Sequence, residues 1–291
     1  IRDRFWREEG GPREGKVLPE HVVCVAKGGE GRELVRRAVE GLGGLSGIVK
    51  SGDRVVVKPN VGFPVRDAVT SPEVVAELVE MAYEAGAGEV LVVESSVRGS
   101  DTTYCFRETG YFDALKPLGV EIVDLKRSGT VITVRCEDAY RLKTVDVYEE
   151  AYDADVLISV AKMKRHVSAD VTLGMKNLIG CFPDWEKGRF HREGLHECIA
   201  DIAHILKPDL VVVDGTTAMT KRGPTGGVMV PAEVVVASRD PLACDYVAAK
   251  ILFELEGVKD PASRAMKVKY FQYAAQLGVG LMGEEVEVVM G

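Results

Sequence analysis

The chain has 291 residues, of which 46% are hydrophobic and 28% charged, and its formal net charge is -8 at pH 7. This length allows a fully buried core in one large domain or two ordinary ones. The net acidity argues against nucleic acid as the main ligand, because proteins that bind it usually carry a basic stripe. No apolar run approaches the roughly 18 residues of a membrane span, and no secretory signal opens the chain, so we expect a cytoplasmic protein without a membrane partner.

Six cysteines are scattered along the chain, and none forms a Cys-x-x-Cys pair. This spacing argues against a zinc or iron–sulfur site built from neighbouring cysteines. A disulfide framework is not expected either, and we predict buried free thiols. The six are Cys24, Cys105, Cys136, Cys181, Cys198 and Cys244.

Residues 1–16 mix charges of both signs with Gly10-Gly11-Pro12, which predicts a flexible N-terminal arm. From residue 17 to 291 we expect a single domain, with the alternative of two α/β lobes split near residues 126–150 and a cleft between them. The first predicted elements are a strand at Val22–Ala26, a helix at Arg32–Leu42 and a strand at Arg54–Lys58.

A clear helix pattern follows, and the sequence allows two alternative residues as its N-cap. Thr70 and Glu73 have the spacing of a capping box, while Ser71 followed by Pro72 offers a cap with proline at the first helical position. An apolar stripe of helical period comes next, and then the strand Glu89–Val93. A strand–helix–strand unit implies parallel pairing and a right-handed crossover.

The alternation continues to the end of the chain. Val120–Val123 is a predicted strand, and residues 129–145 alternate more loosely, as antiparallel strands at an edge or between domains would. The later elements are a strand Val156–Ala161, a helix Leu195–Leu206, a strand Leu210–Val213, an extended run Val228–Ala237, a helix from Asp240-Pro241 and a strand Val286–Val289. The predicted class is α/β, with a mixed, largely parallel sheet and flanking helices.

The most informative segment is Lys162-Met163-Lys164-Arg165-His166, directly after the apolar run Asp155–Ala161. If the strand continues, Lys162, Lys164 and His166 lie on one face beyond its carboxyl end. Ligands bind at this end of the strands in open α/β sheets. Such groups repel one another unless an anion, a carboxylate or a metal-bound ligand lies among them.

Three other apolar strands also end in polar residues. Lys58-Pro59-Asn60, Glu94-Ser95-Ser96 and Asp214-Gly215-Thr216 each follow a run of valines or leucines. Because the carboxyl ends of parallel strands meet at one edge of a sheet, we expect these groups to converge. For each end alone, solvation or helix capping is the alternative.

The segment Thr172–Asn177 follows the basic cluster closely. Thr172 can cap a helix whose first amides face an anion, and Lys176 and Asn177 add charge and hydrogen bonding. With the basic cluster, this segment predicts one anion-binding wall. The alternative is an ordinary helix start with an exposed lysine.

A basic, glycine-rich loop follows the Asp214 strand. Within Gly223-Pro224-Thr225-Gly226-Gly227, the candidates for a backbone anion nest or a lid are Gly223, Thr225 and Gly226. A plain connecting turn is the alternative. The chain contains neither a Walker A loop nor a Gly-x-Gly-x-x-Gly fingerprint after a strand.

Three further histidines have a poor spacing for joint metal ligation. His196 and His204 lie far apart around the predicted helix, and we expect structural or surface roles for them and for His191. His166 is the better functional histidine.

In these segments the chain resembles the domain of unknown function 362 family. The matching segments cover roughly residues 50 to 245 and are, in order, Val57-Lys58-Pro59-Asn60, Thr70-Ser71-Pro72, Glu94-Ser95, Lys162–His166, Thr172–Asn177, and Asp214 with Gly223-Pro224. The resemblance supports the fold and the site more than a reaction. Many relatives carry cysteine-rich, ferredoxin-like modules, which implies iron–sulfur or redox work in those members, and this chain has no such module.

The leading hypothesis is an enzyme that acts on a small anionic metabolite, a carboxylate or phosphate, through a Lys/His cleft. The candidate catalytic residues are His166, Lys162, Glu94 and Asp214. The candidate ligand-binding residues are Lys58, Asn60, Ser95, Lys164, Thr172, Lys176, Asn177, Gly223, Thr225 and Gly226.

Several roles stay open within this hypothesis. His166 would carry the proton, because its ordinary pKa lies near neutrality. Glu94 or Asp214 would orient that histidine or bind a divalent metal, the one cofactor that the residues suggest. A lysine kept neutral by its cationic neighbours is the alternative base or nucleophile.

Two other functions compete with an enzyme. One is a cofactor- or partner-binding subunit in iron–sulfur or redox metabolism, and the other is a non-catalytic ligand sensor. A homo-oligomer or a complex with a redox partner protein is compatible with the sequence.

Overall fold

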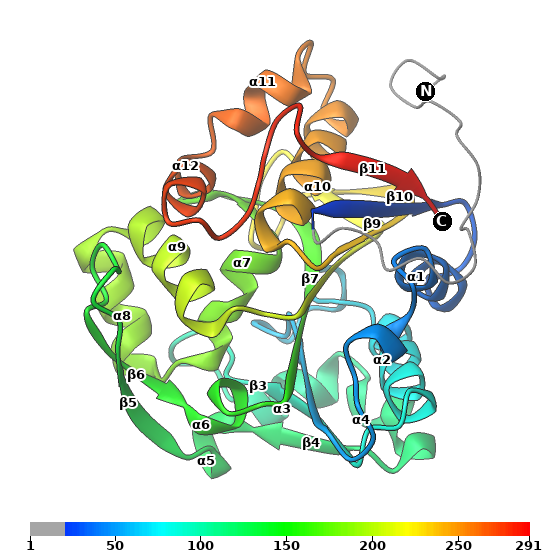
Figure 1. Cartoon of the computed structure of the whole chain (residues 1–291), viewed down its shortest axis with the longest axis vertical. Coiled ribbons are helices and arrows are strands. Elements are labelled where there is room, and N and C mark those ends of the chain that lie inside the picture. The colour runs from blue at the N-terminus through cyan, green and yellow to red at the C-terminus, as the bar shows by residue number, and fades with distance from the viewer. Residues whose placement is uncertain (1–20) are drawn as a thin grey trace.

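The computed structural model describes residues 21–291, so the predicted arm at residues 1–16 lies outside the described residues. A nine-stranded mixed sheet forms the centre (Figure 1). Along the sheet the order is β11-β1-β10-β9-β7-β2-β3-β4, and β8 pairs with the end of β7. The strands are β1 (Val22–Lys27), β2 (Arg54–Pro59), β3 (Glu89–Glu94), β4 (Glu121–Asp124), β7 (Val156–His166), β8 (Asp170–Thr172), β9 (Leu210–Thr220), β10 (Val228–Ser238) and β11 (Glu287–Met290).

The five strands from β9 to β4 are parallel neighbours, as the strand–helix–strand pattern predicts. β10 runs antiparallel to β9 and β1 antiparallel to β10, while β11 runs parallel to β1. The predicted class, a mixed and largely parallel α/β sheet with flanking helices, is therefore confirmed. The parallel half brings the carboxyl ends of β9, β7, β2 and β3 to one edge.

Helices cover both faces of this sheet (Figure 1). Val55 and Val57 of β2 contribute to one buried apolar cluster, and Val56 between them contributes to the other, because side chains alternate along a strand. The helices are α1 (Gly31–Glu40), α2 (Pro72–Glu84), α3 (Thr102–Glu108), α4 (Tyr111–Leu115), α5 (Leu125–Ser128), α6 (Glu149–Tyr152), α7 (Gly174–Asn177), α8 (Asp184–Glu193), α9 (Leu195–Leu206), α10 (Pro241–Leu255), α11 (Pro261–Met266) and α12 (Lys269–Gln276).

Of the two predicted starts of helix α2, the structure has the one at Ser71-Pro72. Ser71 is its N-cap and Pro72 its first residue. Thr70 instead lies inside the protein, where its hydroxyl donates to the Val160 carbonyl at 2.7 Å and accepts from the Asn60 amide at 3.0 Å. Thr70 therefore fastens the segment after β2 to β7 and does not cap the helix.

The loosely alternating segment forms a small sheet of its own. Strands β5 (Val131–Arg135) and β6 (Thr144–Tyr148) pair antiparallel beside α6 and α8 (Figure 1). Val145 and Val147 of this hairpin join the apolar cluster on the α8–α9 face. Division of the chain into two lobes near residues 126–150 stays a prediction.

Two structural strands are longer than the sequence predicts. β7 runs on from Ala161 to His166 because its end pairs with β8, and β9 runs on from Val213 to Thr220 because it forms a long hairpin with β10. All six cysteines are free thiols, and five of them are buried. Within the described part of the chain, no helix has the length and apolarity needed to cross a bilayer.

Candidate functional site

Two buried ion pairs lie at the carboxyl ends of the parallel strands. Lys58 at the end of β2 contacts Glu94 at the end of β3, with 2.8 Å between Nζ and a carboxylate oxygen. Lys162 on β7 contacts Asp214 on β9 at 3.1 Å. The structure therefore brings the four predicted strand ends together as two neighbouring pairs.

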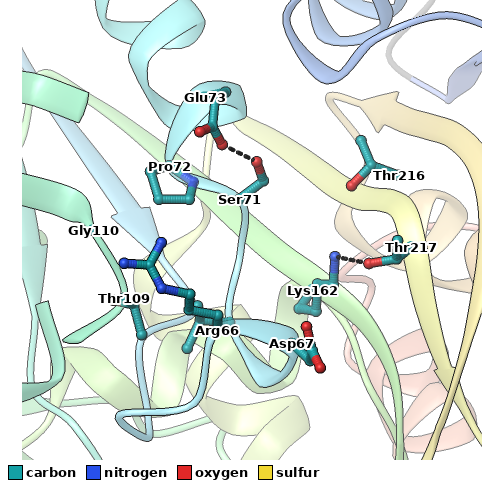
Figure 2. Close-up of a pocket in the computed structure, with 11 residues that line it drawn as sticks. Arg66, Asp67, Ser71, Pro72, Glu73, Thr109, Gly110, Lys162, Thr216 and Thr217 are labelled. Carbon is teal, nitrogen blue, oxygen red and sulfur yellow. Dashed lines mark hydrogen bonds between the residues drawn. The ribbon is translucent and has the colours of Figure 1, made fainter. Parts of the chain in front are cut away.

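Asp214 and Lys162 both make further hydrogen bonds, which offset the cost of burying their charges. One Asp214 oxygen accepts from the Ser71 amide at 2.8 Å, and the other accepts from the Thr216 amide and hydroxyl at 2.9 and 2.6 Å. Lys162 also donates to the Thr217 hydroxyl at 3.1 Å (Figure 2). The pair ties the start of α2 to β7 and β9, and each of its charged groups makes at least one further hydrogen bond.

Glu94 is engaged in the same manner. Besides the Lys58 ammonium, its carboxylate accepts from the amides of Val61 and Ser95, both at 2.8 Å. Gly180 packs directly over the pair, and a Cβ there would lie only 2.0 Å from a Glu94 oxygen. The Lys58–Glu94 pair is therefore a packed structural element at the floor of a cavity, which Glu94 helps to line.

Two cavities adjoin these strand ends, and the larger has a volume of about 630 Å³, within the range usual for small-molecule sites. It is enclosed by the ends of β2 and β3 with the segments after them, the end of β7, α7, the turn after it, and α8. Its lining residues are Asn60, Gly62, Phe63, Glu94, Ser95, Val97, Arg98, His166, Thr172, Lys176, Asn177, Ile179, Gly180, Lys187, Gly188, His191, Arg192 and Pro224.

The predicted single wall of Lys162, Lys164 and His166 is not formed, although side chains still alternate along β7. Ala161 and Met163 belong to one apolar cluster, and the register shift beside Lys162 comes from the extra residues of β9 between Asp214 and Met219. Lys162 lines a separate cavity of about 250 Å³, shown in Figure 2, whereas His166 lines the larger one. Lys164 lines neither cavity.

Lys164 is almost fully buried. Its ammonium donates to the Asn60 side-chain oxygen at 2.7 Å and to the Ala68 carbonyl. Burial, followed by the charges of Lys176 and Lys162, lowers its pKa from 10.5 to about 7. Lys164 therefore holds Asn60 in place and loses its proton far more readily than an ordinary lysine.

Lys176 is the lysine that faces the larger cavity without a partner. It is half-buried, and within residues 21–291 its ammonium makes no hydrogen bond or ion pair. Burial lowers its pKa from 10.5 to about 8. An ammonium of this kind can bind an anion, and once deprotonated it can accept a proton.

The predicted capping role of Thr172 is wrong. Helix α7 has only four residues, its N-cap is Leu173, and its first amides, from Gly174 and Met175, donate to Asp245 at 2.6 and 3.0 Å. The first two amides of the helix are therefore occupied by a carboxylate of the protein itself. Burial raises the pKa of Asp245 to about 8 in spite of these two hydrogen bonds.

Thr172 lies instead on the cavity wall. The residue is 2% exposed, and its hydroxyl has no hydrogen-bond partner within residues 21–291. A buried hydroxyl left unpaired costs free energy. This cost would be recovered if a ligand in the cavity supplied the partner.

Asn177 connects the cavity floor to the sheet. Its amide nitrogen donates to the Lys58 carbonyl at 2.9 Å and to the Ser159 hydroxyl at 3.1 Å. Its oxygen accepts from Lys58 Nζ at 3.3 Å and from Asn60 Nδ2 at 3.1 Å. All four positions of the side chain that can form hydrogen bonds are thus used within the protein.

His166 is half-buried in the cavity wall. The Ser168 amide donates to its Nδ1 at 3.1 Å, so the neutral ring carries its proton on Nε2. Burial and the nearby charges of Lys176 and Lys164 lower its pKa to about 2. The ring is therefore neutral at physiological pH.

The glycine-rich loop contributes less than predicted. Pro224 lines the larger cavity, but Gly223, Thr225 and Gly226 line neither cavity. Gly223 packs tightly on the Arg165 backbone instead, where a Cβ would lie 1.7 Å from the Arg165 carbonyl oxygen. The loop therefore touches the cavity through one proline.

Several cavity residues were not among the sequence candidates. Arg98, Lys187, His191 and Arg192 all line it, although His191 was expected to have a structural or surface role. The Lys187 ammonium is buried and donates to the carbonyls of Ser95 and Ser96 and to the Ser95 hydroxyl. No motif marks these residues, because they come from a loop and a helix that meet only in the fold.

The described part of the chain holds no group of three or more His, Cys, Asp or Glu side chains placed to bind a metal ion. Glu94 and Asp214, the two predicted carboxylates, instead pair with Lys58 and Lys162.

The chain is similar to a known protein sequence and to several solved structures. It is 35% identical to the thylakoid-associated protein sll1697 of Synechocystis sp. over 227 residues, which are 75% of this chain and 68% of that protein. Among solved structures, a Thermotoga maritima protein matches with a TM-score of 0.43 and 12% identity, covering 80% of this chain and 59% of that one.

The lactate racemase apoprotein of Thermoanaerobacterium thermosaccharolyticum matches with a TM-score of 0.42 and 14% identity, covering 79% of this chain and 58% of that one. The chain thus spans less than two thirds of either solved structure. The sequence profile of the domain of unknown function (DUF362) matches residues 55–250. With this match over most of its length, the chain belongs to the DUF362 family.

Proposed function

We propose that the protein is an enzyme that binds a small carboxylate- or phosphate-bearing metabolite in the larger cavity. The observation that carries the proposal is the balance of charge in the lining. Its one carboxylate, Glu94, is already paired with Lys58. The lining also contains four basic side chains, those of Arg98, Lys176, Lys187 and Arg192, so basic groups outnumber acidic ones.

Lys176 is the group that would react. It faces the cavity, has no partner among the described residues, and has a pKa of about 8. A base works best when its pKa lies near the working pH, and desolvation is the usual way to bring a lysine into that range. In this proposal Lys176 attracts the anion as an ammonium, releases that proton to solvent, and then accepts a proton from the bound substrate as a free amine.

Thr172 and His166 would bind the substrate. The Thr172 hydroxyl has an unused donor and acceptor, and the neutral His166 ring has a proton on Nε2 to donate. A ring with a pKa of about 2 accepts protons poorly near pH 7. We therefore assign His166 to hydrogen bonding and move the proton-transfer role to Lys176.

The experiment compares Lys176→Met with Lys259→Met, which removes an exposed lysine outside both cavities. Small carboxylates and phosphate esters are screened by thermal shift, and the ligands found are then tested for turnover by mass spectrometry. We expect the parent and Lys259→Met to bind and convert a common ligand, and Lys176→Met to lose both properties while melting normally.

Three results would count against the proposal. Equal binding and turnover in the two lysine variants would remove Lys176 from the site. Saturable binding without turnover of any ligand would favour a sensor over an enzyme. A brown or metal-rich preparation of the parent, with no affinity for these metabolites, would favour a redox subunit.

A further inference from the structure

We propose that Arg98 and Arg192 form a phosphate subsite at the outer rim of the larger cavity. The ligand would then be a phosphorylated metabolite whose second polar end reaches Lys176. This inference rests on the proposed function of the cavity and names the class of molecule that it takes.

The two guanidinium groups converge over a glycine. A Cβ added to Gly188 of α8 would lie 3.3 Å from Nη1 of Arg98 and 3.4 Å from Nη1 of Arg192. Arg192 lies one helical turn after Gly188, and Arg98 comes from the segment after β3. The missing side chain at Gly188 thus lets two cationic groups from distant parts of the chain lie close together.

Nothing in the described protein neutralises this pair. Within residues 21–291 neither arginine makes a hydrogen bond or an ion pair, whereas nine of the fourteen other arginines in that range pair with a carboxylate or a carbonyl. Two guanidinium groups repel each other at this range. An anion between them would turn that repulsion into attraction on both sides.

The segments that carry the two arginines are fastened together. Lys187 of α8 donates to the Ser95 carbonyl at 2.6 Å and to the Ser96 carbonyl at 2.8 Å. Lys126 donates to the carbonyls of Val97 and Ser100 and to Asp184 at the start of α8, all at 3.0 Å. The backbone around Arg98 therefore has a fixed position relative to the helix that carries Arg192.

Phosphate fits this geometry better than a single carboxylate. A phosphate group has oxygens on several sides and can accept paired N–H bonds from two planar guanidinium groups at once. Arg98 and Arg192 are exposed, Lys176 is half-buried, and Thr172 is 2% exposed, so the polar groups run from the rim into the interior. A molecule with a phosphate at one end and a carboxylate or carbonyl at the other would engage both ends of this series.

The test titrates inorganic phosphate into the full chain and follows binding by calorimetry. Arg98→Gln and Arg192→Gln keep hydrogen-bonding capacity but remove the charge, and Arg135→Gln, on the exposed hairpin strand β5, is the matched control. We expect the double variant Arg98→Gln/Arg192→Gln to lose at least about tenfold in phosphate affinity. The control should bind phosphate as tightly as the parent.

Gly188→Ala gives a second, independent readout. Alanine favours the helix, so the variant should fold at least as well as the parent. Its Cβ would lie in contact with both guanidinium groups, 3.3 and 3.4 Å from their Nη1 atoms, and would occupy part of the space between them, so phosphate affinity should fall without any change of charge. A Gly188→Ala protein with the parent's phosphate affinity would contradict the placement of the subsite.

The outcomes separate this inference from the proposed function. Lys176→Met should retain phosphate affinity at the rim while losing carboxylate binding and turnover. If the parent shows no saturable phosphate binding, or the arginine variants bind as the parent does, the subsite is refuted, even if Lys176→Met abolishes turnover. If the arginine variants lose phosphate while Lys176→Met leaves carboxylate binding and turnover intact, the subsite stands and the assignment of Lys176 fails.

Discussion

Lys58 and Glu94 form an ion pair across two neighbouring parallel strands, with 2.8 Å between their charged atoms and almost no exposure of either side chain. Such a pair is costly to desolvate, and removal of one partner leaves a buried charge without compensation. Its place directly under Asn177 and Gly180 makes it part of the support of the larger cavity.

We therefore expect Glu94→Gln to lower the free energy of unfolding by about 3–5 kcal/mol, because the Lys58 side chain would stay buried with no carboxylate beside it. Urea denaturation measures the change. Glu84→Gln is the control, since Glu84 pairs with Arg36 at the surface and such pairs contribute at most about 1 kcal/mol. Similar small losses in both variants would show that the buried pair is not a structural support.

Thr172 and Thr70 allow a matched test of the unpaired hydroxyl. Thr172→Val removes a buried hydroxyl without a partner, so stability should stay the same or rise by up to about 1 kcal/mol, while ligand affinity falls. Thr70→Val removes a hydroxyl with two partners and should destabilise by about 1–3 kcal/mol. If Thr172→Val proves as destabilising as Thr70→Val, the hydroxyl has a partner within the folded protein.

Lys164 predicts a pH dependence of stability. In the unfolded chain its pKa is near 10.5, and in the folded protein it is about 7, so between these values the unfolded state binds more protons. The free energy of unfolding should therefore rise with pH above about 7, and Lys164→Met should reduce that slope by up to about 1.4 kcal/mol per pH unit. Denaturation curves from about pH 7 to about pH 8 measure it, and an unchanged slope in Lys164→Met would contradict the lowered pKa.

Lys176 predicts opposite pH dependences for binding and turnover. Anion binding uses the ammonium and should weaken as the pH rises through about 8, whereas proton abstraction uses the free amine, so kcat/KM should rise over the same range until weaker binding offsets it. Lys176→Arg should preserve binding but abolish turnover, because arginine stays charged. Turnover that survives in Lys176→Arg would show that another group transfers the proton.

The sequence predicts the sheet well because its strands are apolar on both faces and the connecting helices carry clear start signals. The strands around Val55, Val90 and Val156 read as buried runs, and Ser71-Pro72 marks the start of a helix as sharply as any local signal can. Convergence of Lys58, Glu94, Lys162 and Asp214 follows from parallel pairing alone.

The details of the site depend on contacts that local patterns do not encode. Lys162 and Lys164 lie two residues apart on β7, but Lys162 pairs with Asp214 beside the smaller cavity, whereas Lys164 contacts Asn60 and the Ala68 carbonyl. Asp245 reaches the start of α7 from a helix about seventy residues further along the chain, which displaces Thr172 from its predicted capping role. Arg98 and Arg192 meet only because loop and helix pack together over Gly188.

The hydrogen bonds of Asn177 have a consequence for how the protein could change its ligand. They join the residue next to Lys176 to β2 and β7, so the inner end of the cavity takes its shape when the sheet folds. The outer end consists of long, exposed side chains on a loop and a helix surface. Substitutions at this outer end would change which molecules bind and would leave the position of the Lys176 amine unchanged. Ligand selectivity and the proposed reactivity of Lys176 would then evolve separately in this fold.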